Sequence, residues 1–440
     1  MVNISRRAFH RVLGAAFGAL SSPPVLAAGP RVVVIGGGFG GASVAKYLRR
    51  HDSGIAVTLI EPKKIYHTCP FSSHVVAGLA EMKSIARGYG ALQNAHGVTI
   101  VHDHAASVDP ERRMVALKGG GRVGYDRLVM APGIGFRWND VAGYDAAAST
   151  AMPHAWNAGP QTLLLRRQLR AMEDGGLVIV SPPPGLYRCG PAPYERVSLI
   201  ADFLKREKLR AKILVLDPKE NFSQQEKFRA GWEQLYGGMI EWLPLSEDGK
   251  IIRVDAKSMT VETDFGETYQ GAVINFIPAQ WAGDIARAAG LTDASGWCPV
   301  DPVTFESTLA ANIHVLGDSA QAAPMPKSAY TANSQAKAVA LAVAALLGGQ
   351  APPQTAAFDS LCYSLVGPGY GIKIAGAYRA ANGAFEPDET PKMPDKPGAR
   401  AADAASAADW YRNITREVFG YGRARNSPWL GRQPLSNAIK

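Results

Sequence analysis

The chain has 440 residues, of which 47% are hydrophobic and 19% charged, and this composition is that of a globular protein with two or three domains rather than a disordered chain. The formal net charge is +9, and it becomes +6 (9 minus 3) without residues 1–28, which hold three arginines and no acid. Because no dense block of lysine and arginine stands elsewhere, the charge does not indicate a nucleic-acid partner.

The first residues have the layout of an export signal. Arg6 and Arg7 precede the apolar run VLGAAFGAL (12–20), and the small residues of PVLAAG (24–29) suit a cleavage site. The apolar run is too short for a membrane span, which needs about 20 residues. The pattern predicts a twin-arginine signal over residues 1–28 and a periplasmic location, in preference to a membrane anchor or a mitochondrial presequence.

A strand, a glycine turn, a helix and a second strand follow in order. RVVVIGGGFGGASVAKYLRR (31–50) contains the first three, and VTLIEP (57–62) is a strand that ends on an acid. The glycines of the GxGxxG sequence are Gly36, Gly38 and Gly41. Their bare backbone can face a pyrophosphate, while Glu61 stands where a carboxylate accepts from ribose hydroxyls. This order predicts a site for FAD or NAD.

Two later segments each predict a buried strand followed by a turn. They are YDRLVMAPG (125–133) and NIHVLGDSA (312–320), and they resemble the second and third FAD contacts of flavoproteins with two dinucleotide-binding domains. That resemblance implies FAD rather than NAD, with Asp318 holding the ribityl chain. The other cofactor contacts expected in or beside these segments are Pro132, Gly133, Gly317 and Lys327.

An alanine-rich stretch within residues 324–349 predicts a helix that ends at a glycine pair. The resemblance implies that the amino end of this helix points at the flavin ring, where the positive end of its dipole stabilises the anionic reduced form. A helix with a purely structural role is the alternative.

The strand GGLVIV (175–180) should open a second nucleotide-binding unit, but SPPPG (181–185) follows it. Three consecutive prolines supply no N–H donors, and their rings occupy the space where a backbone must approach a phosphate. We therefore expect no NADH binding at this unit.

The chain has four cysteines, which are Cys69, Cys189, Cys298 and Cys362. They contain no CxxC spacing, which excludes a zinc knuckle, and an oxidising compartment would allow three full pairings among them. Cys189 and Cys362 lie in segments flanked by glycine and proline that suit the lining of a pocket. We expect these two to pair, either as a redox couple or as a structural disulfide, and Cys298 to be a buried thiol.

The C-terminal part has two expected features. Residues 383–408 are rich in proline, alanine and charge and predict a linker. Residues 408–422 predict a short amphipathic helix that packs back on the body, with too few apolar residues to bury in lipid.

Six segments together resemble the flavoprotein subunit of flavocytochrome c sulfide dehydrogenase, a family related to the sulfide:quinone oxidoreductases. The segments are RVVVIGGGFGGASVAKYL, IYHTCPFSSHVVAG, YRCGPAPYER, the stretch from VINFIPAQ to GWCPVD, VLGDSAQAAPMPKSAYTANSQAKA and LCYSLVGPGYGI. The resemblance extends to about residue 420 and leaves residues 423–440 without an expected role.

The resemblance implies the roles of four residues. Cys69 is expected to be bonded through sulfur to the 8α carbon of FAD, Cys189 and Cys362 to form a redox-active disulfide beside the flavin, and Glu195 to be an acid or base. The ordinary alternatives are a free thiol in a turn for Cys69 and an ion pair with Arg196 for Glu195. Because the chain has no CxxCH sequence for haem attachment, a c-type cytochrome acceptor must be a separate subunit.

The expected fold is α/β, with two Rossmann-like, three-layer ββα dinucleotide-binding domains and a C-terminal α+β region, as in FAD- and NAD-linked disulfide reductases. The expected boundaries are 1–28 for the signal, 29–150 and 276–350 for the two parts of the FAD domain, 151–275 for the degenerate NAD-type domain, 351–422 for the C-terminal domain and 423–440 for the tail.

These expectations describe a periplasmic FAD enzyme that oxidises sulfide to sulfur or polysulfide and passes the electrons to a c-type cytochrome in a heterodimer, without metal or stable membrane insertion. Three alternatives stay open. They are a sulfide:quinone oxidoreductase, a flavin-bearing partner that modulates a cytochrome or a sulfur-oxidation complex, and an NADH-linked disulfide or polysulfide reductase.

Overall fold

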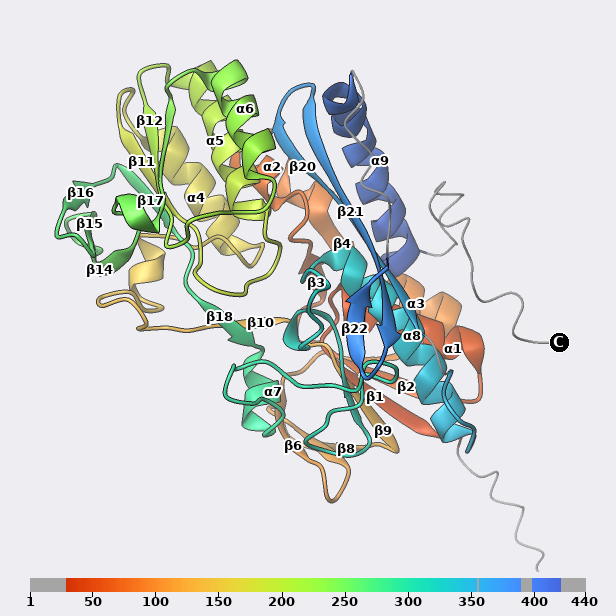
Figure 1. Ribbon diagram of the computed structural model, residues 1–440. Coiled ribbons are helices and arrows are strands. Elements are labelled where there is room, and N and C mark those ends of the chain that lie inside the picture. The colour runs from red at the N-terminus through yellow and green to blue at the C-terminus, as the bar shows by residue number, and fades with distance from the viewer. Residues whose placement is uncertain (1–28, 354–355, 389–397, 421–440) are drawn as a thin grey trace, which may run out of the picture.

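The computed structural model describes residues 29–353, 356–388 and 398–420 (Figure 1). The expected signal over residues 1–28 and the tail over residues 423–440 lie outside these described residues. No helix in the described ranges combines the length and the apolar character that crossing a membrane requires.

The first unit is built on a parallel five-stranded sheet. Its strands, in spatial order, are β19 (Ile313–Val315), β9 (Arg127–Met130), β1 (Arg31–Ile35), β2 (Ala56–Ile60) and β5 (Thr99–Val101). The helices on one face are α1 (Phe39–His51), α3 (Gly90–His96) and α8 (Ala329–Leu347). The small sheet on the other face consists of β6 (Ala105–Asp109), β7 (Met114–Leu117) and β8 (Arg122–Gly124).

Alternation along β1 explains these three layers. Val32 and Val34 pack among α1 and α8, whereas Val33 and Ile35 pack against the small sheet. Successive side chains of a strand point to opposite faces, and a parallel strand covered on both faces is apolar throughout. The run VVVI in the sequence is therefore the signature of a strand between two layers.

The second unit repeats this design on a parallel four-stranded sheet. Its strands are β13 (Ile240–Leu243), β12 (Lys212–Leu216), β11 (Leu177–Ser181) and β17 (Val273–Phe276). The helices are α4 (Pro160–Ala171), α5 (Ala192–Glu207) and α6 (Gln225–Tyr236), and the opposite layer is β14 (Ile251–Asp255), β15 (Thr260–Thr263) and β16 (Thr268–Gln270). The expected α/β fold with two three-layer units is thereby confirmed.

An antiparallel pair connects the two units. Strand β10 (Ile134–Phe136) follows the first unit, and β18 (Gln280–Ala282) leads the chain back into it before α7 (Asp284–Ala288). The remaining short elements are β3 (Ile65–His67), α2 (Ser72–Val76), η1 (Met82–Ile85), β4 (Ala86–Gly88), η2 (Ala148–Thr150), η3 (Leu245–Glu247) and η4 (Gly317–Ser319).

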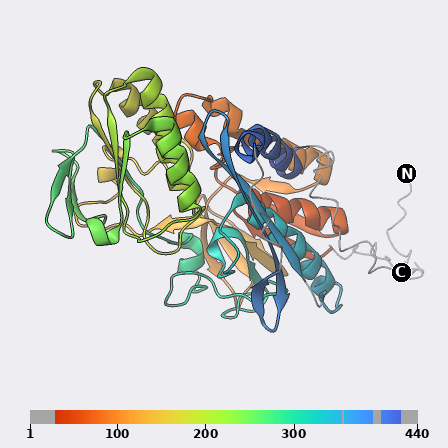
Figure 2. The ribbon, with the colours of Figure 1, turned by 45° about the horizontal axis from the view of Figure 1, so that its top comes forward.

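A long hairpin runs between the two units. It consists of β20 (Ala357–Gly367) and β21 (Tyr370–Ala381), extended by β22 (Ala384–Pro387). Strand β20 contacts α5 of the second unit, α8 of the first unit and the last helix, α9 (Ala399–Phe419), and Figure 2 shows the hairpin crossing the molecule beside α9.

The linker expected over residues 383–408 is wrong in its described parts. Strand β22 occupies its beginning, where Ala384–Pro387 pair with β21, and α9 begins at Ala399 rather than near residue 408. The first turns of α9 are rich in alanine, which has the highest helix propensity of the amino acids, and that propensity outweighs the polar composition.

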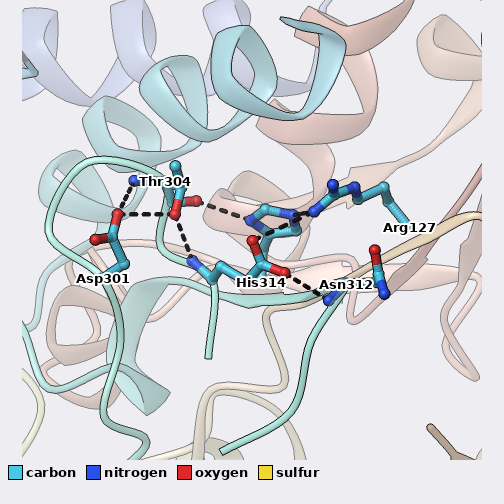
Figure 3. A network of polar contacts seen from close by, with 6 residues as sticks. Arg127, Asp301, Thr304, Asn312 and His314 are labelled. Atoms are coloured by element: carbon cyan, nitrogen blue, oxygen red, sulfur yellow. Dashed lines mark hydrogen bonds and ion pairs between the residues drawn. The ribbon is translucent and has the colours of Figure 1, made fainter. Parts of the chain in front are cut away.

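A polar network closes the amino-terminal edge of the first sheet (Figure 3). His314 is fully buried, and its Nδ1 donates to the Thr304 carbonyl (2.8 Å) while its Nε2 accepts from Arg127 Nη1 (3.3 Å). Arg127 also pairs with Glu306 (3.3 Å), and Thr304 is held by Asp301. Burial lowers the pKa of His314 to about 4, so this histidine is neutral.

Candidate active site

One large cavity lies where the two units and the hairpin meet. It encloses about 1620 Å³ of space, its open mouth included, and its wall includes the amino ends of α1, α5 and α8 together with β20 and α9. The residues that the sequence analysis selected and that line this cavity are Gly36, Gly38, Glu61, Cys69, Pro132, Gly133, Cys189, Glu195, Gly317, Asp318 and Cys362.

The glycine turn fills the gap between β1 and α1. Gly36 has φ +96°, a conformation that favours glycine, and a Cβ on Gly41 would lie 1.8 Å from the Gly36 carbonyl oxygen. Gly41 therefore allows the helix to pack tightly against the turn and does not line the cavity, whereas Gly36 and Gly38 do.

Glu61 lies at the end of β2, beside the glycine turn. Its Oε2 accepts from the Gly37 amide (2.7 Å) and its Oε1 accepts from the Lys63 amide (2.9 Å). The carboxylate is thus buried and fixed in orientation next to the amino end of α1. This arrangement fits the ribose and pyrophosphate of a dinucleotide.

The two other predicted FAD segments meet on the same side of the sheet. The Gly133 carbonyl accepts from Ser319 Oγ (2.5 Å), which joins the turn after β9 to the turn after β19. Asp318 is half-buried at this junction, and desolvation raises the pKa of its carboxyl group. The first turn of α8 faces the cavity through Ser328, Ala329 and Tyr330, so its dipole end is directed there.

Lys327 lies behind this junction rather than in the lining. Its Nζ donates to the carbonyls of Asp318 (2.7 Å) and Ala320 (2.8 Å) and stands 3.8 Å from the ring centre of Trp297. Burial lowers the pKa of Lys327 to about 8. Lys327 was expected to contact the cofactor. In the structure its ammonium group instead binds these two carbonyls and so holds the segment that carries Asp318.

Cys69 projects from the turn between β3 and α2. Its Sγ donates to the Trp156 carbonyl at 3.7 Å and lines the cavity. The turn is tight, since Phe71, two residues further on, has φ +67°.

Cys189 reaches the cavity from the second unit and Cys362 reaches it from the hairpin. Cys189 lies in the loop between β11 and α5, and Cys362 lies on β20 opposite Ile374. Burial raises the pKa of both thiols, that of Cys362 to about 12, and the neighbouring Cys362 raises the pKa of Cys189 further.

The structure describes all four cysteines as free thiols, so the pairing expected of Cys189 with Cys362 is not formed in it. A redox-active pair exists both as a dithiol and as a disulfide, and thiols correspond to the first of these forms. Cys298 is fully buried and does not line the cavity, in agreement with its apolar flank.

Glu195 lies in the first turn of α5 and lines the same cavity as the two thiols. Its Oε1 accepts from the Leu365 amide of β20 (3.1 Å), and burial raises its pKa to about 7. The guanidinium of Arg196 instead donates to the carbonyls of His154 (3.0 Å) and Ala155 (2.9 Å). The ordinary ion pair between Glu195 and Arg196 is thus not formed among the described contacts.

Among the lining residues that the sequence analysis did not select are Arg188 and Trp410. Arg188 donates to the Trp156 carbonyl and to Asn157 Oδ1, and Trp410 reaches the cavity from α9. The position of Arg188 next to Cys189 was a signal that could have drawn attention to it. Trp410 lies in the helix that was expected to pack back on the body, but no local signal indicated that it would reach the cavity.

The comparisons with known proteins agree with this geometry. Residues 162–278 match the central-domain model of the sulfide dehydrogenase [flavocytochrome c] flavoprotein chain, residues 354–419 match the flavin-binding model of flavocytochrome c sulphide dehydrogenase, and residues 30–157 match the pyridine nucleotide-disulphide oxidoreductase model.

Individual relatives point the same way. The chain is 69% identical over 45 residues to the sulfide dehydrogenase [flavocytochrome c] flavoprotein chain of Chlorobaculum thiosulfatiphilum, covering 10% of this chain and 94% of that relative. It is 24% identical over 324 residues to the mitochondrial sulfide:quinone oxidoreductase of Dictyostelium discoideum, covering 70% and 68%.

Among solved structures, the sulfide:quinone oxidoreductase of Aquifex aeolicus superposes with a TM-score of 0.70 at 19% identity, covering 90% of this chain and 93% of that one. At this identity the likeness concerns the fold. The family models and the 69% identical relative establish more, and the chain belongs to the flavoprotein chains of flavocytochrome c sulfide dehydrogenase, a family related to the sulfide:quinone oxidoreductases.

Proposed function

We propose that this protein is the FAD-bearing subunit of a sulfide dehydrogenase, which oxidises sulfide to sulfur or polysulfide and passes the electrons to a c-type cytochrome subunit. The observation that carries the proposal is the convergence of Cys189, Cys362 and Glu195 on the cavity that also contains the dinucleotide cradle. Cys189 and Glu195 lie close together, in a loop and in the helix α5 that follows it, whereas Cys362 comes from β20, far along the chain.

The residues present fit FAD. The glycine turn and Glu61 suit the adenosine and pyrophosphate half, while Asp318 and the amino end of α8 suit the ribityl chain and the ring. When bound, FAD would accept two electrons and release them one at a time, which a haem acceptor requires. Cys69 is the residue we assign to covalent attachment, because its sulfur lines the same cavity.

The oxidised pair of Cys189 and Cys362 is the proposed electrophile. Hydrosulfide attacks one sulfur, a new S–S bond forms to give a persulfide, the original S–S bond breaks, and the other sulfur leaves as a thiolate. Two electrons thereby move from sulfide into the thiol pair. Which of the two sulfurs is attacked first is left open.

Glu195 is the proposed acid and base of this step. A thiol whose pKa burial has raised is a poor leaving group as a thiolate, and a carboxyl group with a pKa near 7 can supply or take the proton at neutral pH. Its contact with the Leu365 amide holds it beside the strand that carries Cys362.

The electron acceptor distinguishes the main alternatives. The chain lacks a CxxCH sequence, and its 69% identical relative is named as a flavocytochrome c chain, which favours a cytochrome on another polypeptide. Several more distant relatives are named as sulfide:quinone oxidoreductases, which keeps quinone as the second candidate. A periplasmic location reached through the twin-arginine signal is part of the proposal with a cytochrome acceptor.

The test is sulfide-dependent reduction of a c-type cytochrome by the purified FAD protein, with a short-chain ubiquinone offered in a parallel assay. We expect cytochrome reduction that Cys362→Ala abolishes and that Cys298→Ala, which removes a buried thiol outside the cavity, leaves in place. Quinone reduction without cytochrome reduction would replace the proposal by its alternative. Tight cytochrome binding without sulfide turnover would favour a modulating partner.

A further inference from the structure

The second unit retains an acid at the position where a dinucleotide unit binds ribose. Asp217 follows β12 directly, as Glu61 follows β2 in the first unit, and β12 and β2 are the corresponding second strands. The Asp217 side chain is fully buried. Its environment therefore decides whether it can still receive a ligand.

Both carboxylate oxygens of Asp217 accept hydrogen bonds from side chains of the protein itself. Asp217 Oδ2 accepts from the Tyr194 hydroxyl (2.6 Å) and from Trp242 Nε1 (3.0 Å), and Oδ1 accepts from Lys219 Nζ (2.6 Å). We call these four residues the Asp217 cluster. A buried carboxylate with a cation and two further donors needs no ribose hydroxyls.

The Asp217 cluster is tied to the loop that carries Cys189. Lys219 Nζ also donates to the Pro183 carbonyl (3.0 Å), so the triple-proline segment is held against the end of β12. The same ammonium stands 5.3 Å from the ring centre of Tyr187, whose hydroxyl donates to the Gly190 carbonyl (3.0 Å). These contacts fix the loop on both sides of Cys189.

The cluster is also tied to Glu195 through the first turn of α5. Three consecutive residues of this turn make contacts in three directions: Tyr194 with Asp217, Glu195 with the Leu365 amide, and Arg196 with the carbonyls of residues 154 and 155. Tyr194 is also stacked on Phe222 at 3.6 Å between ring centres. The direction of Glu195 therefore depends on where Tyr194 is anchored.

Cys189 requires such support because its backbone is strained. Its φ is +58°, which is uncommon for a residue with a side chain. A conformation of this kind persists where the surrounding structure fixes it, and such positions gather at functional sites. The Cys189 amide donates to the Lys327 carbonyl (2.8 Å), and its carbonyl accepts from the Ala192 amide (3.0 Å).

We propose that the Asp217 cluster is a positioning device, in which the ribose-binding acid of a former dinucleotide unit holds Cys189 and Glu195 in their working geometry. The role given to Cys189 and Glu195 rests on the proposed function, but the geometry of the device does not. Tyr194 and Lys219 are positioning residues, since they act through the loop and α5.

The test compares Tyr194→Phe and Lys219→Met with Tyr144→Phe in the FAD-loaded, chemically reduced enzyme. Tyr144 is the matched control, because its buried hydroxyl also binds carbonyls of the second unit, those of Met152 and Phe276. The readout is the pH profile of Cys189 alkylation by iodoacetamide, measured by peptide mass spectrometry with Cys298 as the internal reference, together with the melting temperature.

We expect Tyr194→Phe and Lys219→Met to change the alkylation rate of Cys189 about fivefold or more and to shift its pH profile, since a loosened loop alters both exposure and thiol pKa. The Tyr144→Phe control should lower the melting temperature to a similar extent and leave Cys189 within about twofold of the wild type. An unchanged Cys189 profile in the Tyr194→Phe enzyme, with an equal loss of melting temperature, would overturn the proposal.

This readout needs no turnover, so the two proposals fail separately. A wild-type enzyme that reduces no acceptor with sulfide, yet whose Cys189 responds to Tyr194→Phe, retains the positioning device and loses the proposed function. An enzyme with normal sulfide turnover, whose Cys189 alkylation does not change in the Tyr194→Phe variant, retains the proposed function and loses the positioning device.

Discussion

Glu195 is an acid whose surroundings, rather than its chemistry, suit it to proton transfer at neutral pH. Burial raises its pKa to about 7, and the Leu365 amide and Arg196 oppose that rise only in part. The thiols of Cys189 and Cys362 lie in the same cavity with pKa values that burial has raised. In the proposed reaction, a proton released by sulfide or required by a leaving thiolate can be exchanged with the carboxyl group of Glu195.

Replacing Glu195 by glutamine should slow the reduction of the enzyme by sulfide by about 10²-fold, the usual contribution of a positioned acid or base. In the wild type the base form of Glu195 grows in as pH rises through about 7, so the rate should rise more steeply across that range than in the variant, whose rise reflects only the formation of hydrosulfide. Stopped-flow measurement from pH 5.5 to 8.5 checks both. Glu207→Gln, at the exposed end of the same helix, is the control. A variant with the wild-type rate and pH dependence would exclude the role.

Cys69 offers a second test at the residue scale. If its sulfur carries FAD, acid precipitation of the wild type should leave the flavin with the protein, and Cys69→Ala should release it while Cys298→Ala should not. The absorbance of the supernatant and the mass of the peptide containing residue 69 give the answer. Free FAD released from the denatured wild type would rule out covalent attachment.

At the scale of elements, parallel strands bring the predicted FAD segments together, and polar contacts fix the loops between them. The predicted strands end on the same edge of the first sheet, so Glu61, Gly133 and Asp318 reach one cavity. At the opposite edge the network around His314 fixes the segment before β19. A helix was predicted from residue 408 only, whereas α9 begins at Ala399, because its alanine-rich first turns were assigned to a linker.

The His314 network predicts how stability depends on pH. The folded pKa of His314 is lowered from 6.5 to about 4, so between these values the unfolded chain binds a proton that the folded chain does not. The folded state therefore has its full stability above pH 6.5. As pH falls toward 4, the free energy of unfolding decreases by up to about 3 kcal/mol.

Urea unfolding of the wild type and of His314→Gln at pH 7 and pH 5 tests this. The variant should lose stability at pH 7 and show a weaker fall toward pH 5, whereas His104→Gln, at an exposed position, should follow the wild type. Parallel pH profiles of the wild type and His314→Gln would contradict the assignment.

At the scale of the whole molecule, local motifs predicted what lies within one βαβ unit, whereas the pairing of distant cysteines was suggested by their glycine- and proline-rich flanks and its redox role was predicted only through family resemblance. The turn of Gly36 and Gly38 with Glu61 is contained in about thirty residues of sequence. Cys189 and Cys362 are brought to one cavity by a hairpin that crosses between two domains, and no local periodicity encodes that crossing. The domain boundaries stay predictions.

The second unit leads to a prediction about reductants. The triple-proline turn lacks N–H donors, and the Asp217 cluster occupies the position of the ribose-binding acid. NADH should therefore leave the flavin absorbance near 450 nm unchanged over minutes, whereas sulfide should bleach it rapidly. Anaerobic mixing with each reductant in turn decides this, and fast bleaching by NADH would favour the disulfide-reductase alternative.

Non-reducing peptide mapping of the oxidised enzyme tests whether Cys189 and Cys362 form one redox pair, on which the proposed reaction depends. We expect two peptides joined by a disulfide between residues 189 and 362. Treatment with sulfide should separate these peptides and leave one of them with an additional sulfur atom. An enzyme that is active with sulfide while both thiols stay free, or that joins either of them to a different cysteine, would contradict this pairing.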